Sequence, residues 1–473
     1  MFEINLTKTF SAKGMFIYNI HSVPVQLSGS YEEYSSNPVD IKIWTDDEKP
    51  NKIFHDSMDN PYSVYFEGKT EEGKDILLWK IKPNSITGTR ILEANVSFLI
   101  KDEINSKLFP GQKYEVHINT SPSPLIKPES IYTLRYDGTI SSHKEGIERK
   151  GISWENKIGK ANLIDNYEYI EDEKQNKEYI IRIKTNKLEI NFTPSEEIFV
   201  KDFFIKLPDI IEEDLSLLSF LGRKRVSCYQ AEIISCSDIV SRISFCKYSA
   251  WSGFYNYPHD MSFLRSLIFP RSLQRGVFSE LFSNYMKSKY KEIIDRTLPN
   301  LITSYEDGYL ESHLLNAYAA LESMVDGIGD LHQVNNILDQ KVFKSFSKKI
   351  KKLISDEIEK KESRDQIYKK IPELNRKSFI DKLLYLLNLH EVDRGYIWPP
   401  EIDETVEFGE LIKRRNELIH RGNIEQGITC YFDLARIQTL VELWILKLLD
   451  CPIEDINQHS FYRVVPINKV IHY

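Results

Sequence analysis

A short run near the C-terminal end combines side chains that could cut RNA without a metal ion. Arg415 and Asn416 are adjacent, and His420 follows Asn416 by about one helical turn. Attack by the 2′-hydroxyl requires a base for that hydroxyl, an acid for the leaving 5′ oxygen and positive charge beside the phosphoryl oxygens. An imidazole titrates near neutral pH and suits either proton transfer. A guanidinium fork matches phosphoryl oxygens, and Asn416 could orient the imidazole or contact the substrate.

A single histidine serves only one of the two proton transfers well. A symmetric dimer with two copies of this helix side by side would bring two histidines and two arginines to one phosphate. It would also explain why Arg415 falls near the middle of an apolar stripe, where an unpaired arginine is costly. The stripe consists of Leu411, Ile412, Leu418 and Ile419. We therefore expect a homodimer or higher homo-oligomer with a composite site.

The neighbouring arginines leave the assignment of the catalytic arginine open. Arg414 and Arg415 are not separated on the helical wheel by their distance from His420. Arg415 is preferred because it is adjacent to Asn416. Arg414 and Arg421 are then expected to bind substrate phosphates or to face solvent.

The motif belongs to a series of helices that begins near residue 271. Apolar residues recur there with a helical period. The pattern predicts a helix that Pro299 ends, a helix from Tyr309 to Val325 that Gly327 ends, and a later helix capped by Ser378. Residues 341–377 interrupt the apolar pattern with a basic segment of eleven Lys and two Arg against six acidic residues. The whole chain has a net charge of -8, so any nucleic-acid site must be a local basic patch.

The rest of the sequence predicts an α+β multidomain protein, with a β-rich N-terminal half followed by an all-α bundle. Residues 1–125 contain short apolar or alternating runs separated by turn-forming clusters, which favours an antiparallel sandwich or barrel. Residues 126–270 are mixed α/β and are interpreted as a regulatory or sensor region. Residues 271–473 form the helical bundle.

Composition bounds the class of protein further. Apolar residues make up 41% and charged residues 28%, as in soluble globular proteins. The sequence shows no signal peptide and no apolar run long enough to cross a bilayer. The five cysteines have no metal-ligand or redox spacing. We expect a cytoplasmic protein with no membrane contact, no metal and no cofactor.

The motif resembles that of HEPN ribonucleases, in which an Arg is followed directly by Asn and four residues separate that Arg from a His. The segment Leu310–Met324 resembles the first helix of that fold, where an acidic or polar residue faces the Arg–His pair, and Glu322 matches that position. The whole layout resembles ApeA-type single-protein anti-phage systems. In these systems the HEPN domain is the effector, and the N-terminal part is thought to sense or regulate.

The resemblance implies a metal-independent endoribonuclease that acts as a dimer, often on tRNA loops. It implies catalytic roles for Arg415, Asn416, His420 and Glu322, control by a phage-derived trigger, and a role in abortive infection.

Three alternatives stay open. Arg415 and Glu322 could form only a buried ion pair, with His420 a charge at the helix end. The bundle could bind RNA or a partner without cutting, through the basic segment. An enzyme in the N-terminal half is the last alternative, although no catalytic constellation supports it.

Overall fold

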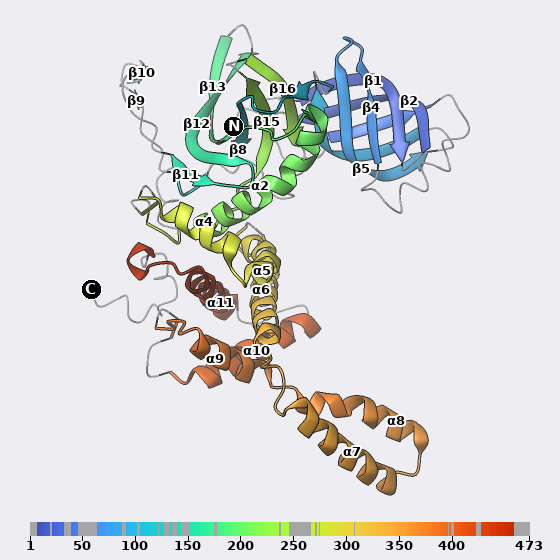
Figure 1. Cartoon of the computed structure of the whole chain (residues 1–473), viewed down its shortest axis with the longest axis vertical. Helices are drawn as coiled ribbons and strands as arrows, with labels where there is room; N and C mark the ends of the chain where they lie inside the picture. The colour runs from blue at the N-terminus through green and yellow to red at the C-terminus, as the bar shows by residue number, and fades with distance from the viewer. Residues whose placement is uncertain are drawn as a thin grey trace. The chain divides into compact units, whose positions relative to one another are not determined.

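The computed structural model of the chain divides into two compact units, residues 1–283 and 284–473. The first is rich in strands and the second is helical, which confirms the predicted α+β layout (Figure 1). The structure describes residues 7–18, 21–32, 39–45, 64–87, 91–101, 105–121, 123–126, 132–134, 140–142, 151–174, 177–235, 238–245, 266–269, 272–273, 275–306, 308–395, 397–398, 402–421 and 427–457.

Six N-terminal strands close into a barrel. They are β1 (Thr7–Tyr18), β2 (His21–Glu32), β3 (Val39–Trp44), β4 (Val64–Thr70), β5 (Asp75–Thr87) and β6 (Ile91–Lys101). The antiparallel pairs are β1–β2, β2–β3, β3–β6, β6–β5, β5–β4 and β4–β1, so the ring has no free edge. Gly14 of β1 faces Gly68 of β4. A Cβ on Gly14 would lie 2.2 Å from the carbonyl oxygen of Glu67, so only glycine allows this approach of the two backbones.

The other strands continue the same sheet in the order β11-β12-β13-β8-β15-β16-β6. They are β8 (Tyr114–Thr120), β11 (Ile152–Glu155), β12 (Gly159–Lys174), β13 (Lys177–Phe192), β15 (Cys228–Ser235) and β16 (Asp238–Phe245). Two short pairs stand apart, β7 (Lys107–Leu108) with β14 (Ile198–Phe199) and β9 (Tyr132–Leu134) with β10 (Ile140–Ser142). Strand β8 precedes residue 125 but pairs with β13 and β15, which follow it. Hydrogen bonding in the sheet therefore continues across residue 125.

A buried carboxyl group ties helix α2 (Val200–Gly222) to the sheet. Asp214 of α2 accepts hydrogen bonds from Trp154 Nε1 at 2.6 Å and from Asn156 Nδ2 at 2.9 Å. Burial raises the pKa of Asp214 to about 7, and the two hydrogen bonds oppose that rise only in part. The folded chain therefore binds this proton more tightly than the unfolded chain does. The resulting stability is present at low pH and is lost as pH rises from about 4 to 7.

We expect this titration to separate the wild type from an Asp214→Asn variant, which cannot ionise. The unfolding free energy of the wild type, measured relative to the variant, should fall by roughly 2–4 kcal/mol between pH 4 and 7. Chemical denaturation followed at several pH values measures the difference. Parallel pH curves for the two proteins would contradict a raised pKa at this position.

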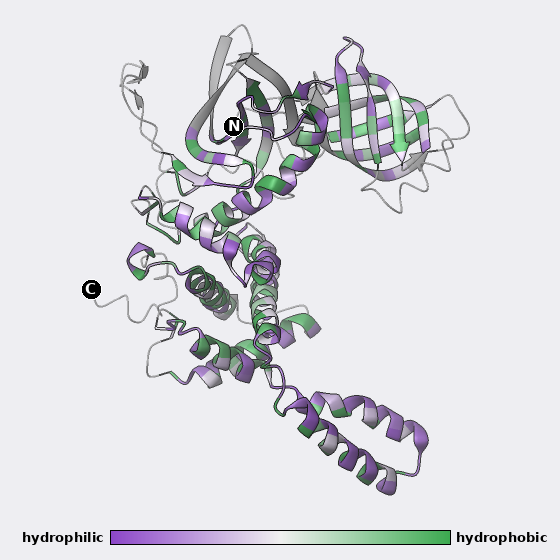
Figure 2. Ribbon diagram, viewed as in Figure 1, coloured by the Kyte–Doolittle hydropathy of each residue, from purple (hydrophilic) through white to green (hydrophobic). Residues whose placement is uncertain are grey.

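The second unit is a bundle of helices. They are α4 (Val277–Lys287), which spans the division between the units, α5 (Lys291–Thr303), α6 (Leu310–Leu331), α7 (Gln340–Glu357), α8 (Lys361–Lys370), η3 (Ile371–Asn375), α9 (Phe379–Leu389), α10 (Glu404–Arg421), α11 (Gly427–Leu448) and η4 (Ile453–Asp455). Helix α6 packs against α5, α9 and α11. Helix α11 is largely apolar (Figure 2). Within the described ranges, every helix is too short or too polar to cross a bilayer.

Two of the predicted helix ends are wrong, and one predicted cap is confirmed. Gly327 does not end its helix, because α6 continues to Leu331. A Cβ on Gly327 would lie 2.9 Å from Ile293, so this glycine allows α5 to approach α6 closely. Pro299 lies inside α5, where burial of apolar neighbours such as Leu298 offsets the hydrogen bond that proline cannot donate. Ser378 caps α9 as predicted, with its hydroxyl oxygen accepting from the backbone N–H of Asp381 at 3.1 Å.

Candidate active site

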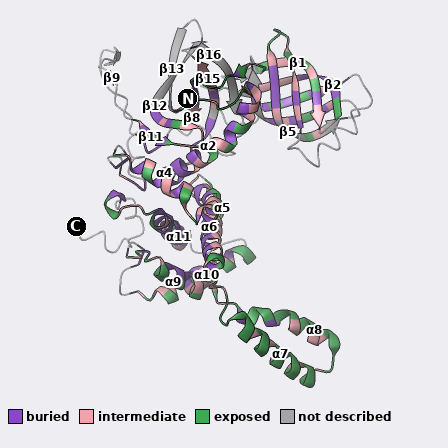
Figure 3. Cartoon of the chain, in the orientation of Figure 1, coloured by how far each residue is buried: buried purple, intermediate pink, exposed green. Residues whose placement is uncertain are grey.

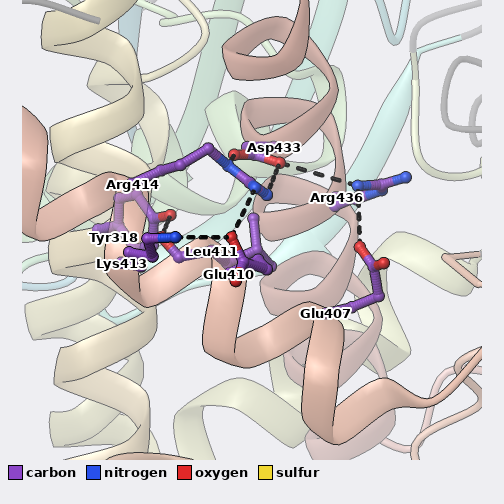
Figure 4. Close-up of polar contacts among 8 residues, drawn as sticks. All are labelled: Tyr318, Glu407, Glu410, Leu411, Lys413, Arg414, Asp433 and Arg436. Atoms are coloured by element: carbon purple, nitrogen blue, oxygen red, sulfur yellow. Dashed lines mark hydrogen bonds and ion pairs between the residues drawn. The ribbon is translucent and has the colours of Figure 1, made fainter.

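Arg414 is held inside the bundle by a carboxylate that the sequence analysis did not identify. Asp433 of α11 has no exposed side-chain surface. The guanidinium of Arg414 donates to both of its oxygens, from Nε at 2.5 Å and from Nη2 at 3.0 Å. Arg436 Nη1 lies 3.8 Å from the same carboxylate and 3.7 Å from Glu407, and Glu410 lies 3.9 Å from Arg414 (Figure 4).

The charges of this pair compensate one another. Burial raises the pKa of Asp433, and the hydrogen bonds from Arg414 oppose that rise. Burial lowers the pKa of Arg414, but the hydrogen bond and charge of Asp433 outweigh burial and raise it overall. This geometry assigns Arg414 to the packing of α10 against α11, whereas the sequence analysis expected it to bind substrate phosphates or to face solvent. The available signal was an acidic residue inside the otherwise apolar stripe of α11.

Helix α10 is also fixed to α6 at the turn that precedes Arg415. The buried hydroxyl of Tyr318 donates to the carbonyl oxygen of Leu411 at 2.5 Å (Figure 4). In a helix that carbonyl also accepts from the N–H four residues later, which belongs to Arg415. Burial is the main cause of a raised pKa for Tyr318, so the hydroxyl stays a donor across the whole physiological range. The backbone from which Arg415 extends is therefore anchored to a second helix.

The structure brings Arg415 together with Glu322 and Asn416. Arg415 Nη2 lies 2.5 Å from Glu322 Oε1 on α6, and Nη1 donates to Asn416 Oδ1 at 3.1 Å. The side chains of Arg415 and Glu322 are 28% and 38% exposed, so the pair lies at the surface edge of the bundle rather than in its core. Asn416 therefore orients Arg415 in this state, rather than the imidazole. Within the described part of the chain, Arg415 Nε has no hydrogen-bond partner.

His420 lies apart from that group, at the exposed end of α10. Its side chain and that of Asn416 are both exposed, and among the described residues no hydrogen bond joins them. Five residues turn a helix by about 140°, so Arg415 and His420 project from different sides. Leu411 and Leu418 of the predicted apolar stripe are buried, but Ile419 is 48% exposed.

One further predicted residue cannot be placed. The side chain of Arg421, which was expected to bind substrate phosphates or to face solvent, lies outside the described residues.

A second group of titratable side chains lies elsewhere in the bundle. The hydroxyl of Tyr290 lies 3.1 Å from His332 Nε2 and 3.2 Å from His390 Nε2. Trp444 Nε1 donates to His390 Nδ1 at 2.8 Å. A neutral His390 must then carry its proton on Nε2, so that nitrogen is not a free metal ligand. Burial, with a smaller contribution from His332, lowers the pKa of His390 to about 4.

Because His390 stays neutral in the folded chain, acid should destabilise the helical unit. The unfolded chain binds this proton near pH 6.5 and the folded chain only near 4, so stability is lost as pH falls through that window. Relative to a His390→Gln variant, the wild type should lose on the order of 1–3 kcal/mol, after allowance for its partial exposure. Denaturation curves recorded from pH 7 to 4 test this, and an unchanged difference between the two proteins would refute it.

Among the described residues, no cluster of three or more His, Cys, Asp or Glu side chains is arranged to hold a metal ion. A cavity of about 810 Å³ opens on the barrel and is lined in part by Asp40, Lys42 and Glu93. Lys42 and Glu93 pair with each other at 3.9 Å. The cavity belongs to the first unit and is not part of the arginine–histidine site.

No family model, curated protein or solved structure matches the chain.

Proposed function

We propose that the chain is a metal-independent endoribonuclease of the HEPN type. The observation that carries the proposal is Arg415, anchored beside Glu322 and Asn416, on the same helix as the exposed His420. A guanidinium at the surface and an imidazole in solvent are the two groups that RNA cleavage by a 2′-hydroxyl needs.

The reaction we propose uses two copies of the chain. His420 of one copy takes the proton of the 2′-hydroxyl as that oxygen bonds to phosphorus. The bond from phosphorus to the 5′ oxygen breaks, and His420 of the second copy donates a proton to the leaving oxygen. The products are a 2′,3′-cyclic phosphate and a 5′-hydroxyl. Arg415 stabilises the charge that grows on the phosphoryl oxygens.

The contacts of the two arginines support Arg415 as the catalytic one. Arg414 would have to leave a fully buried carboxylate to reach a phosphate, which would strand Asp433 without its hydrogen bonds. Arg415 is paired with the half-exposed Glu322 and makes one more hydrogen bond, to Asn416. A guanidinium has five N–H donors, so Glu322 and Asn416 can hold it in place while others face a substrate.

The test is cleavage of purified cellular RNA by the purified chain in the presence of EDTA. We expect fragments with 2′,3′-cyclic phosphate and 5′-hydroxyl ends, formed at the same rate with and without the chelator. Activity that EDTA abolishes, or products with 5′-phosphate ends, would contradict the mechanism.

The composite site also requires that two copies of the chain associate. Sedimentation of the active protein should show a dimer or a larger assembly. Adding an excess of His420→Ala chains to wild-type chains should suppress cleavage, because mixed dimers hold only one histidine at each phosphate. A strictly monomeric active state, or undiminished activity in the mixture, would contradict a composite site.

The biological setting is also part of the proposal. We propose that the nuclease acts in the cytoplasm in anti-phage defence by abortive infection, with tRNA among its targets. A phage-derived trigger would act through the β-rich unit. This part rests on the resemblance to ApeA-type systems described above.

One observation favours a second candidate, an RNA- or partner-binding module that does not cut. The charge of Arg415 is already compensated by Glu322 within the same chain. If that pair is purely structural, RNA should bind with steep salt dependence, and no cleavage should appear in any state of association.

A further inference from the structure

The hairpin formed by α7 and α8 carries a positive charge that the rest of the chain lacks. Residues 340–370 hold eleven Lys and Arg against five Asp and Glu, a net charge of +6 in a chain of net charge -8. Neither helix contains a buried residue, and Figure 3 shows both as mostly exposed, with some residues of intermediate exposure. Helices are usually stabilised by burying an apolar face. A hairpin that leaves its apolar side chains unburied is better suited to binding than to packing.

The lysines of α7 form a ridge along one side of the helix. Lys341, Lys344, Lys348 and Lys352 follow the i, i+3, i+7, i+11 spacing that aligns side chains on a helix face. All four are exposed. In the described ranges, no ion pair engages any of them. The ridge spans roughly 16 Å, a row of uncompensated cations long enough to follow several phosphates of one strand.

An exposed apolar stripe runs along a different side of α7 from the ridge. Val342, Phe346 and Leu353 are 55%, 45% and 64% exposed. Phe346 lies one turn before the exposed Lys349, which is outside the ridge, so its ring is suited to stacking on an unpaired base beside a phosphate contact. A membrane-binding helix needs a broad apolar face opposite its cations. The exposed apolar face of α7 consists of only three residues, which is narrow for membrane binding. Further cations such as Lys361 and Lys369 lie on α8.

The two ends of the hairpin are fastened to one another. The side-chain oxygen of Asn375 accepts from the backbone N–H of Leu338 at 2.7 Å, and its side-chain nitrogen donates to the Leu338 carbonyl at 3.0 Å. The backbone N–H of Ile337 donates to the Asn375 carbonyl at 2.8 Å. The hairpin is therefore a fixed structural element, inserted after α6. That helix also carries Glu322, about 14 Å before its end.

We propose that the lysine ridge binds the phosphates of RNA, so that the hairpin recruits folded RNA to the chain. The consequence for cleavage rests on the proposed nuclease function, but RNA binding by the ridge does not. An RNA that contacts both the ridge and Arg415 must extend over several helical turns. A stem–loop has that length, and a dinucleotide does not.

The test compares RNA binding by three full-length chains, each with His420→Ala so that nothing is cut. One has no further change. The second has the ridge lysines neutralised as K341Q, K344Q, K348Q and K352Q. The third is a matched control with four exposed lysines of the first unit neutralised as K13Q, K113Q, K160Q and K206Q. Fluorescence anisotropy with a labelled stem–loop RNA gives the affinity at several salt concentrations.

We expect the ridge variant to bind at least about tenfold more weakly, with the salt slope of its affinity reduced by about 3. The control should bind as the parent does. Equal weakening in both variants, or none in either, would overturn the proposal. Preferential binding of the parent to phosphatidylserine vesicles over RNA would also overturn it.

The nuclease proposal and the hairpin proposal can be refuted independently of one another. If the ridge variant with an intact His420 cleaves stem–loop RNA at the wild-type kcat/KM, the hairpin has no part in recruitment and the nuclease proposal stands. If the wild type binds stem–loop RNA through the ridge but never cleaves it, the nuclease proposal falls and the hairpin proposal stands.

Discussion

His420→Ala is expected to lower RNA cleavage by at least about 100- to 10,000-fold, the usual contribution of a single general acid or base. The loss is large because each phosphate would lose both of the proton-transfer groups that two copies supply. The imidazole is exposed at the end of α10, so the unfolding free energy should change by no more than about 0.5 kcal/mol. The measurement is the cleavage rate on purified RNA, with circular dichroism as the check on folding.

A matched substitution separates a catalytic loss from a general effect of removing a histidine. His21 is an exposed histidine in the barrel, and His21→Ala should cleave as the wild type does. Arg415→Ala should show a loss comparable to that of His420→Ala, because the phosphoryl charge would lose its stabilisation. Full activity in His420→Ala would exclude His420 as the proton-transfer group.

Asp433→Ala is expected to destabilise the helical unit by about 3–5 kcal/mol. The change leaves the guanidinium of Arg414 without its two hydrogen bonds at a site that is only 18% exposed. It also removes the acidic neighbour of Arg436 at 3.8 Å. Urea denaturation followed by circular dichroism measures the loss.

The control for this pair is a neighbouring carboxylate in solvent. Glu410 lies 3.9 Å from Arg414, but its side chain is 49% exposed. Glu410→Ala should therefore cost less than about 1 kcal/mol. Similar losses in the two variants would show that burial of Asp433 does not determine the strength of its pair with Arg414.

Local pattern predicted the parts of the fold that depend on neighbouring residues. Alternation in the N-terminal half predicted strands, helical periodicity predicted the bundle, and Ser378 predicted the start of α9. The sequence pattern did not distinguish a closed barrel from a sandwich, because the pairing of β3 with β6 joins residues about fifty positions apart. Gly327 misled the prediction of a helix end, because its reason lies in Ile293 on another helix.

The same difference between local and long-range information holds for the candidate site. The spacing of Arg415, Asn416 and His420 is local and was visible in the sequence. Glu322 was matched through a resemblance, and the structure places it 2.5 Å from Arg415 although the two are 93 positions apart in the chain. Asp433 could not be foreseen as the partner of Arg414, because a helical wheel gives the face of a residue but not what packs against it.

The most direct test of the central claim is sequencing of RNA fragment ends after expression in cells, with the wild type beside His420→Ala. We predict fragments with 2′,3′-cyclic phosphate ends at defined positions in the wild type alone. These positions should include tRNA loops. Identical fragment ends in the two strains would contradict the claim that His420 cuts RNA.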